Sequence, residues 1–326
     1  MSKKIENIID KYNKKKILFT AGPASLVYEN VINLKPCFGR GDKEYLKTEK
    51  KVLKKIKKIA GGFDNIARFQ GSGSLAIEIM ISNFMFGNVL VVDTGYYSDR
   101  LYRIANDHKN LFRYIKNVKK INWRNLDKVN SKFDWVIACP TETSCGLKLD
   151  IRKLKKFSTK LRSKLMLDAT GSIGLERHHE LADVISFSSC KGLFGLTGAG
   201  FICFNKKFSN SIPSFYLNLN NHLEKKMTGP YQIIYSLEKV LDKYSDLRQS
   251  VIINKKKFVK KMRNYLSYPI EFQPNLCTHV SKKLSSKSKN VVLYTPRNNI
   301  GGSVVCHLGE AHLGKNAKGN ILDLLY

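Results

Sequence analysis

The chain has 326 residues, 43% of them hydrophobic and 25% charged, which supports a sizeable buried core and excludes wholesale disorder. No apolar run approaches the roughly 20 residues of a membrane-spanning helix, and the basic start has no apolar core typical of a secretory signal. Seven cysteines without a CxxC pair indicate neither a disulfide framework nor a zinc site. We therefore expect a cytoplasmic protein without a metal centre.

Strand-like and helical patterns alternate along the chain. Short apolar runs predict strands at residues 17–23, 89–93, 135–139, 165–168, 184–187, 201–204 and 291–294. Amphipathic spacing predicts helices at residues 45–60, 75–84, from 97 onward, 151–163 and 230–266. Strands that alternate with helices are typical of an α/β domain with a mostly parallel sheet.

The same pattern predicts the division of the chain. Residues 1–20 form a basic N-terminal arm, and residues 21–232 carry the α/β pattern of a large domain. The long helical stretch that follows is typical of a connection between domains. Residues 233–326 then form a small C-terminal domain, which we expect to be a reduced α+β unit.

The formal charge of +31 comes mostly from lysine, since only 12 of the 57 basic residues are arginine. Arginine is the usual residue for phosphate forks and base edges. The lysines are spread along the chain beside many Asn and Ile, as a compositional bias of the genome would produce. We expect neither nucleic acid nor a membrane as a partner, with a functional basic face as the alternative.

Three features with chemical potential follow predicted strands, where ligands of open α/β sheets bind. Residues 71–74 (GSGS) open a helix and offer backbone N–H groups to a phosphate, or simply form a helix cap. Asp168 can hold a cation or a protonated ring nitrogen, or cap its own turn. Lys191 lies in a segment without other charges, where partial desolvation favours a nucleophilic amine, although most lysines are surface residues.

In combination, these features match the requirements of pyridoxal phosphate (PLP). Five segments, GSGSLAIE (71–78), VVDTGYY (91–97), ETSCG (142–146), DATGS (168–172) and SSCK (188–191), resemble the class V aminotransferases of PLP fold type I. The nearest branches are the 2-aminoethylphosphonate–pyruvate and alanine–glyoxylate transaminases. The resemblance covers about residues 18–228 and implies a large domain with a mostly parallel seven-stranded sheet.

The resemblance also implies roles for particular residues. It implies a homodimer in which Thr228 reaches the cofactor phosphate of the neighbouring subunit. Lys191 would form the Schiff base with PLP and act as the catalytic base. The other cofactor contacts would be Ser72, Gly73 and Ser74 on the phosphate, Tyr97 on the ring face, Thr143 near the ring hydroxyl and Asp168 on the ring nitrogen. For Tyr97 and Thr228, the residues alone favour a core aromatic and a helix cap.

The chain departs from the family pattern at two points. Cys190 stands before the lysine, where the family has Asn or Gln. His307 stands where the family has a substrate-binding Arg, so Arg40, with Arg297 as a further candidate, is an alternative anchor for an anionic substrate. The C-terminal part is also short for the family.

The leading interpretation is an aminotransferase that moves an amino group from a small anionic compound, with 2-aminoethylphosphonate as first candidate, to pyruvate or another 2-oxo acid. A PLP-dependent lyase or another transferase would use the same residues. A non-catalytic protein with the PLP fold is the third interpretation, favoured by the missing Arg and opposed by the Lys191–Asp168 pair.

Overall fold

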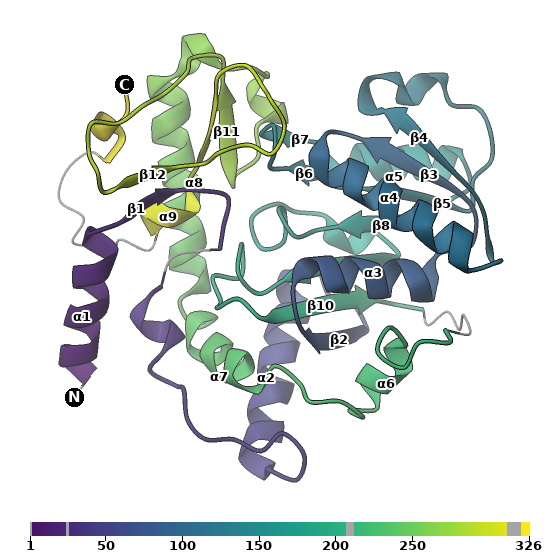
Figure 1. Cartoon of the computed structure of the whole chain (residues 1–326), viewed down its shortest axis with the longest axis horizontal. Helices are drawn as coiled ribbons and strands as arrows, with labels where there is room; N and C mark the ends of the chain where they lie inside the picture. The colour runs from purple at the N-terminus through teal and green to yellow at the C-terminus, as the bar shows by residue number, and fades with distance from the viewer. Residues whose placement is uncertain (1, 24–25, 207–211, 312–320) are drawn as a thin grey trace.

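A seven-stranded sheet forms the centre of the computed structural model, which describes residues 2–23, 26–206, 212–311 and 321–326 (Figure 1). In spatial order its strands are β2 (Asn65–Gln70), β10 (Ala199–Phe204), β9 (Val184–Ser188), β8 (Lys164–Asp168), β5 (Trp135–Ala138), β3 (Gly87–Asp93) and β4 (Ile115–Asn122). β10 runs antiparallel to both of its neighbours, and all other adjacent pairs in this sheet are parallel. The expected α/β fold with a mostly parallel seven-stranded sheet is therefore confirmed.

Helices cover both faces of this sheet, so its central strands are mostly apolar. One face is covered by α3 (Gly73–Phe84) and α4 (Tyr96–Leu111). The other face is covered by α2 (Lys43–Ile59), α5 (Ile151–Lys160) and α7 (Tyr231–Val240). Strand residues alternate between the two cores, as the two-residue period requires.

A second group of elements joins the two ends of the chain. Strand β1 (Ile17–Phe19) pairs in parallel with β12 (Val291–Leu293), and β11 (Cys277–Val280) pairs with β13 (Ser303–Cys306). Helices α8 (Tyr244–Lys261) and α9 (Leu308–Ala311) pack with them, while α1 (Ser2–Lys14) precedes β1. The residues of the predicted N-terminal arm thus contribute a strand beside the C-terminal elements. The predicted domain boundaries stay a prediction.

Short elements complete the described chain. They are the hairpin of β6 (Thr141–Glu142) with β7 (Leu147–Lys148), the helix α6 (Leu219–Leu223) and the 3₁₀ turns η1 (Tyr28–Asn30), η2 (Trp123–Lys128), η3 (His179–Leu181), η4 (Arg263–Tyr265), η5 (Ile270–Phe272) and η6 (Ile321–Leu324). Among the described residues, no helix is both long and apolar enough to cross a membrane.

A buried charge cluster ties the segment after α6 to the large sheet. Glu49 on α2 and Arg68 on β2 are both buried and form an ion pair of 2.6 Å between Oε1 and Nε. Lys225 also pairs with Glu49, and the Tyr45 hydroxyl donates to it at 2.8 Å. Burial alone would raise the pKa of Glu49, but the hydrogen bonds from Lys225 and Arg68 hold it below its ordinary value.

Replacing Arg68 by methionine leaves Glu49 buried with fewer partners. We expect the free energy of unfolding at pH 7 to fall by about 3 kcal/mol, because the remaining carboxylate loses its closest buried cation. The stability lost in Arg68→Met should be smaller at acidic pH. The ionised Glu49 stabilises the fold above the ordinary carboxyl pKa, and this stabilisation is lost as the pH falls through the lowered folded value.

Urea unfolding at pH 7 and at about pH 4 measures both effects, with the exposed Arg113→Met as the matched control. A cost equal at the two pH values, or equal to that of the control, would contradict this account of the cluster.

Candidate active site

The first turn of α3 lies against the loops that follow β8 and β9. Ser72 caps the helix, and its hydroxyl accepts the Leu75 N–H at 3.4 Å. A Cβ on Gly73 would lie 3.1 Å from Thr170 Oγ1 and 3.4 Å from the Ser188 Cβ. A side chain here would have to displace these neighbours by a few tenths of an ångström, so glycine suits the close approach. The first-turn N–H groups have no acceptor within the helix.

Asp168 ends β8 as a buried carboxylate with a cation beside it. Its Oδ1 accepts the Thr170 N–H at 3.0 Å, and its Oδ2 lies 3.5 Å from Nη2 of Arg100 on α4. The same guanidinium donates from Nη1 to Ser74 Oγ at 3.0 Å. Arg100 therefore links the first turn of α3 to Asp168 at the end of β8.

Tyr97 and Lys191 complete this cluster. The Arg100 guanidinium lies 4.9 Å from the centre of the Tyr97 ring, and Lys191 Nζ lies 5.5 Å from it. Lys191 is half-buried, and a Cβ on Gly22 would come within 3.0 Å of its Cγ. Among the residues that the structure describes, no carboxylate forms an ion pair with Lys191. Its stem packs against Gly22.

The side chain of Glu142 fixes the helix that carries Tyr97 and Arg100. This buried carboxylate accepts the backbone N–H groups of Tyr97 at 3.0 Å and Ser98 at 3.1 Å. Burial raises its pKa against the effect of hydrogen bonds from Ser144 and these backbone groups. Glu142 thus acts as a cap for α4 that is supplied from the β6–β7 hairpin.

The structure brings together most, but not all, of the predicted site residues. Ser72, Gly73, Ser74, Tyr97, Asp168 and Lys191 share one cluster, and Thr143 follows the capping Glu142. Cys190 lies beside Ser188, with 3.6 Å between Sγ and Oγ. Arg40 and Thr228 are exposed, and neither is hydrogen-bonded or ion-paired to the cluster within the described ranges.

His307 is fully buried and does not present a positive charge. Its Nε2 lies 3.0 Å from Thr278 Oγ1, and burial lowers its pKa to about 3. Arg297 is exposed instead, with its guanidinium 5.5 Å from the centre of the Tyr96 ring. Interaction with the Tyr97 hydroxyl raises the pKa of Arg297. Of the three candidate anchors, Arg297 is the one beside the cluster.

Two site residues were missed by sequence reasoning. Arg100 follows Tyr97 by three positions, so the helical period places both on one face of α4. That spacing could have found Arg100, but its contact with Asp168 joins residues 68 positions apart. Glu142 lies within a recognised motif, yet nothing in its neighbours indicates that it caps another helix.

Buried hydroxyls in these loops suit the binding of a polar cofactor. Thr143 Oγ1, Thr170 Oγ1 and Ser186 Oγ are buried, and none has a hydrogen-bond partner among the described residues. Ser186 lies opposite Asp168 in the sheet register. Buried polar atoms without partners are uncommon and costly unless a ligand satisfies them. Together with the open first turn of α3, they fit a ring that carries both polar substituents and a phosphate.

Comparisons with known proteins relate the chain to aminotransferases in sequence and in fold. No family model matches the sequence. The chain is 26% identical over 207 residues to a bifunctional phosphonoacetaldehyde hydrolase/aminoethylphosphonate transaminase of Clostridioides difficile, covering 59% of this chain and 32% of that protein. It is 24% identical over 259 residues to an uncharacterized aminotransferase of Methanocaldococcus jannaschii, covering 70% of this chain and 66% of that protein. The chain thus spans less than two thirds of both relatives.

Solved structures share the fold over most of the chain. A pyridoxamine–pyruvate aminotransferase from Mesorhizobium loti has a TM-score of 0.76 at 18% identity, over 91% of this chain and 87% of that chain. An alanine–glyoxylate aminotransferase from Nostoc has a TM-score of 0.74 at 18% identity, over 89% and 88%. The fold is therefore that of the PLP fold type I aminotransferases. The resemblance to the class V family that the motifs predicted is confirmed.

Replacing Glu142 by alanine removes the acceptor for two N–H groups at the start of α4. We expect the free energy of unfolding to fall by about 2 kcal/mol, because these donors lose their hydrogen bonds. Glu142→Gln keeps one acceptor oxygen and should cost less. Urea unfolding measures both, with Glu6→Ala on the exposed face of α1 as the control. A cost no larger than that of the control would show that Glu142 does not cap α4.

Proposed function

We propose that this protein is a PLP-dependent aminotransferase, acting on a small anionic amino compound and a 2-oxo acid. One observation carries the proposal. The first turn of α3, the Asp168 carboxylate, the Tyr97 ring and the Lys191 amine form one cluster in a fold whose solved neighbours are aminotransferases. One of the proteins with a similar structure, a phosphoserine aminotransferase, carries a Schiff base.

The residues present fit PLP in the following way. The N–H groups of Gly73 and Ser74, with the Ser72 and Ser74 hydroxyls, would bind the phosphate. Asp168 would hold the protonated ring nitrogen, Tyr97 would cover the ring, and Thr143 would meet the ring hydroxyl. When bound, PLP supplies an aldehyde that takes up amines and a ring that withdraws electrons.

The protein's own residues then move the proton. With PLP bound, the Lys191 Nζ amine would act as the general base for the proton on the substrate carbon. The Lys191 stem packs against Gly22, where an added Cβ would lie 3.0 Å from the Lys191 Cγ. Arg100 adds a positive charge beside Ser74 and Asp168, which would favour the binding of a phosphate at the start of α3.

Arg297 is the proposed anchor for the substrate's anionic group. Its guanidinium is exposed and adjacent to Tyr96, at the residue before the ring-covering Tyr97. The planar guanidinium of an arginine can donate two parallel hydrogen bonds to a pair of phosphonate or carboxylate oxygens. Arg40 stays an alternative anchor, supplied from an exposed loop, whereas the buried neutral His307 lacks the charge for this role. The curated transaminase relative makes 2-aminoethylphosphonate the first donor to test, with pyruvate as acceptor.

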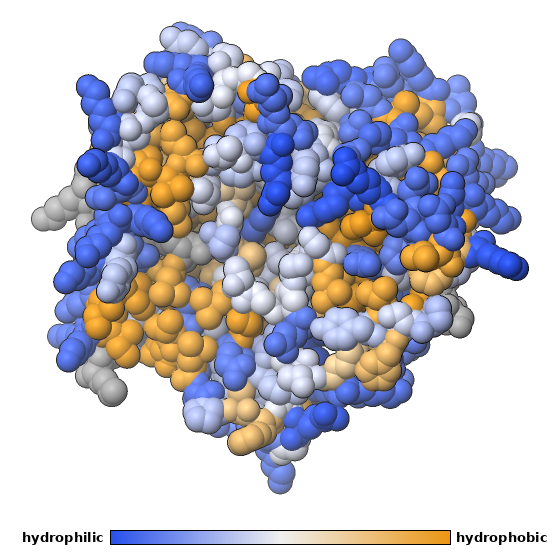
Figure 2. Space-filling model, in the orientation of Figure 1, coloured by the Kyte–Doolittle hydropathy of each residue, from blue (hydrophilic) through white to orange (hydrophobic). Residues whose placement is uncertain are grey.

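A homodimer is also part of the proposal. Large apolar side chains are exposed on the segment after β1, with Phe38 at 79% exposure and Leu26, Ile32 and Leu34 nearby in sequence. Figure 2 shows apolar surface gathered at the lower left of the view, where this segment lies in Figure 1. Burial of this surface against a second copy would remove it from water, and the exposed Thr228 could then reach a neighbouring site.

Lys191→Ala should abolish the covalent attachment of the cofactor. We expect the purified protein with added PLP to show a visible absorbance band shifted from that of free PLP, and the variant to lack the shift. Addition of 2-aminoethylphosphonate or alanine should bleach the band, and a 2-oxo acid should restore it. The exposed Lys206→Ala is the control. A normal band in Lys191→Ala, or none in the wild type at saturating PLP, would overturn the proposed function.

Arg297→Gln should weaken substrate binding more than turnover. Loss of a charge-assisted fork is expected to raise KM for the amino donor about tenfold or more, with a smaller change in kcat. Arg297→Lys should recover part of the loss, and Arg40→Gln tests the alternative anchor in the same assay. If Arg40→Gln raises KM and Arg297→Gln does not, the anchor is Arg40.

A further inference from the structure

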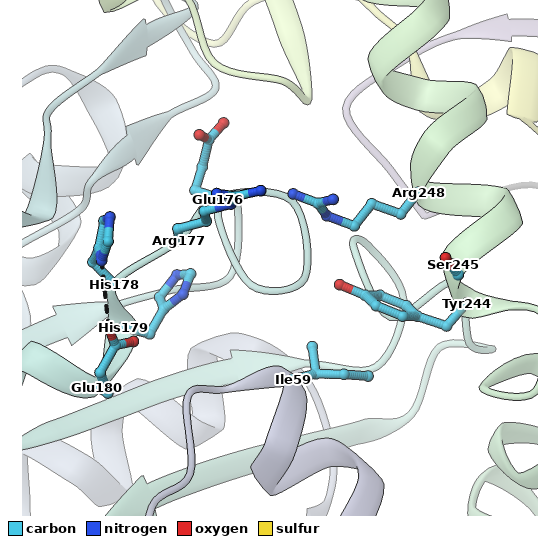
Figure 3. Close-up of a pocket in the computed structure, with 9 residues that line it drawn as sticks. All are labelled: Ile59, Glu176, Arg177, His178, His179, Glu180, Tyr244, Ser245 and Arg248. Atoms are coloured by element: carbon cyan, nitrogen blue, oxygen red, sulfur yellow. Dashed lines mark hydrogen bonds and ion pairs between the residues drawn. The ribbon is translucent and has the colours of Figure 1, made fainter.

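We propose that a pocket between the loop after β8 and helix α8 binds a small oxyanion of the phosphate class. The pocket has a volume of about 420 Å³. Ile59 at the end of α2, residues 176–180 and the start of α8 line it (Figure 3). None of the candidate active-site residues lines it, so this is a separate site.

Two guanidinium groups converge on this pocket. Figure 3 shows Arg177, from the loop, and Arg248, from α8, pointing toward each other. Arg248 Nε donates to the Gly174 carbonyl at 3.0 Å, which fixes the side chain and leaves its terminal amino groups for another partner. Within the described ranges, neither arginine forms an ion pair with a carboxylate. Two cations that face each other without a counter-ion favour the binding of an anion between them.

The acidic residues that line the pocket are engaged elsewhere. Glu176 points away from the arginines in Figure 3, accepts the Asn275 N–H at 2.7 Å and lies 3.7 Å from Lys148 Nζ. Glu180 pairs with His178 at 3.4 Å. His179 is buried and hydrogen-bonded to Ser172, with 2.8 Å between Nε2 and Oγ. Of the charged side chains that line the pocket, the two arginines are therefore the ones without an ion pair among the described contacts.

The paired forks match the tetrahedral oxygens of a phosphate group, which accepts hydrogen bonds from several donors at once. Because Arg177 belongs to the loop after β8 and Arg248 to α8, the bound anion would bridge the large sheet and the helix that leads to the C-terminal elements. The pocket is larger than one phosphate, so the ligand is either the free ion or the phosphate end of a small ester.

Calorimetric titration with inorganic phosphate and with glycerol 3-phosphate tests the site. We expect Arg177→Gln and Arg248→Gln each to weaken binding about tenfold or more, and Arg248→Lys to weaken it less. Arg177 is exposed and has no structural hydrogen bond among the described contacts, so its variant should fold normally. The exposed Arg113→Gln is the matched control. Tighter binding of glycerol 3-phosphate would identify an ester as the ligand, and equal binding would identify the free ion.

A crystal soaked in tungstate gives a direct second measurement. The proposal expects anomalous density between the two guanidinium groups, in addition to any density at the start of α3. Phosphate binding that is unchanged in both glutamine variants, or density at α3 alone, would overturn it. Neither readout depends on transaminase activity, so the failure of this inference can be distinguished from failure of the proposed function.

Discussion

The candidate site depends on the contact of Arg100 with Asp168 and Ser74. Asp168 is only 2% exposed, and burying a carboxylate is costly unless a cation or hydrogen-bond donors pair with it. Arg100 supplies the cation and reaches across to the first turn of α3. Glu142 in turn caps α4, the helix that carries both Arg100 and Tyr97. Loops from β5, β8 and β9 are thereby held around one small volume at the ends of the strands.

The strands of the sheet centre were predictable because they are apolar on both faces. Strands β5, β8, β9 and β10 lie where the apolar runs indicate them. The edge strands β2 and β4 were missed for a physical reason. In β2, the charged Arg68 breaks the apolar pattern, and only its ion pair with the distant Glu49 makes its burial possible. β4 exposes lysines and asparagines at the open edge of the sheet. Their sequences resemble surface segments until their neighbours are known.

The predicted long helix over residues 230–266 is two helices, α7 and α8, separated by a turn at residues 241–243. α7 packs on α2, whereas α8 packs on the C-terminal elements. One straight helix could not make both sets of contacts. The site shows the same limit. The motif residues around Lys191 were predictable from local pattern, but the burial of His307 and the contact of Arg100 depend on segments distant in sequence.

The central claim is that Lys191, among 45 lysines, is the residue that binds PLP covalently. Borohydride reduction of the protein incubated with PLP, followed by peptide mass spectrometry, tests it most directly. Reduction turns the reversible bond between the amine and the aldehyde into a stable one, so the mass of the cofactor stays on the lysine. The account predicts this mass on the peptide that contains Lys191, at near one equivalent per chain. Label spread over surface lysines, with none on Lys191, would contradict it.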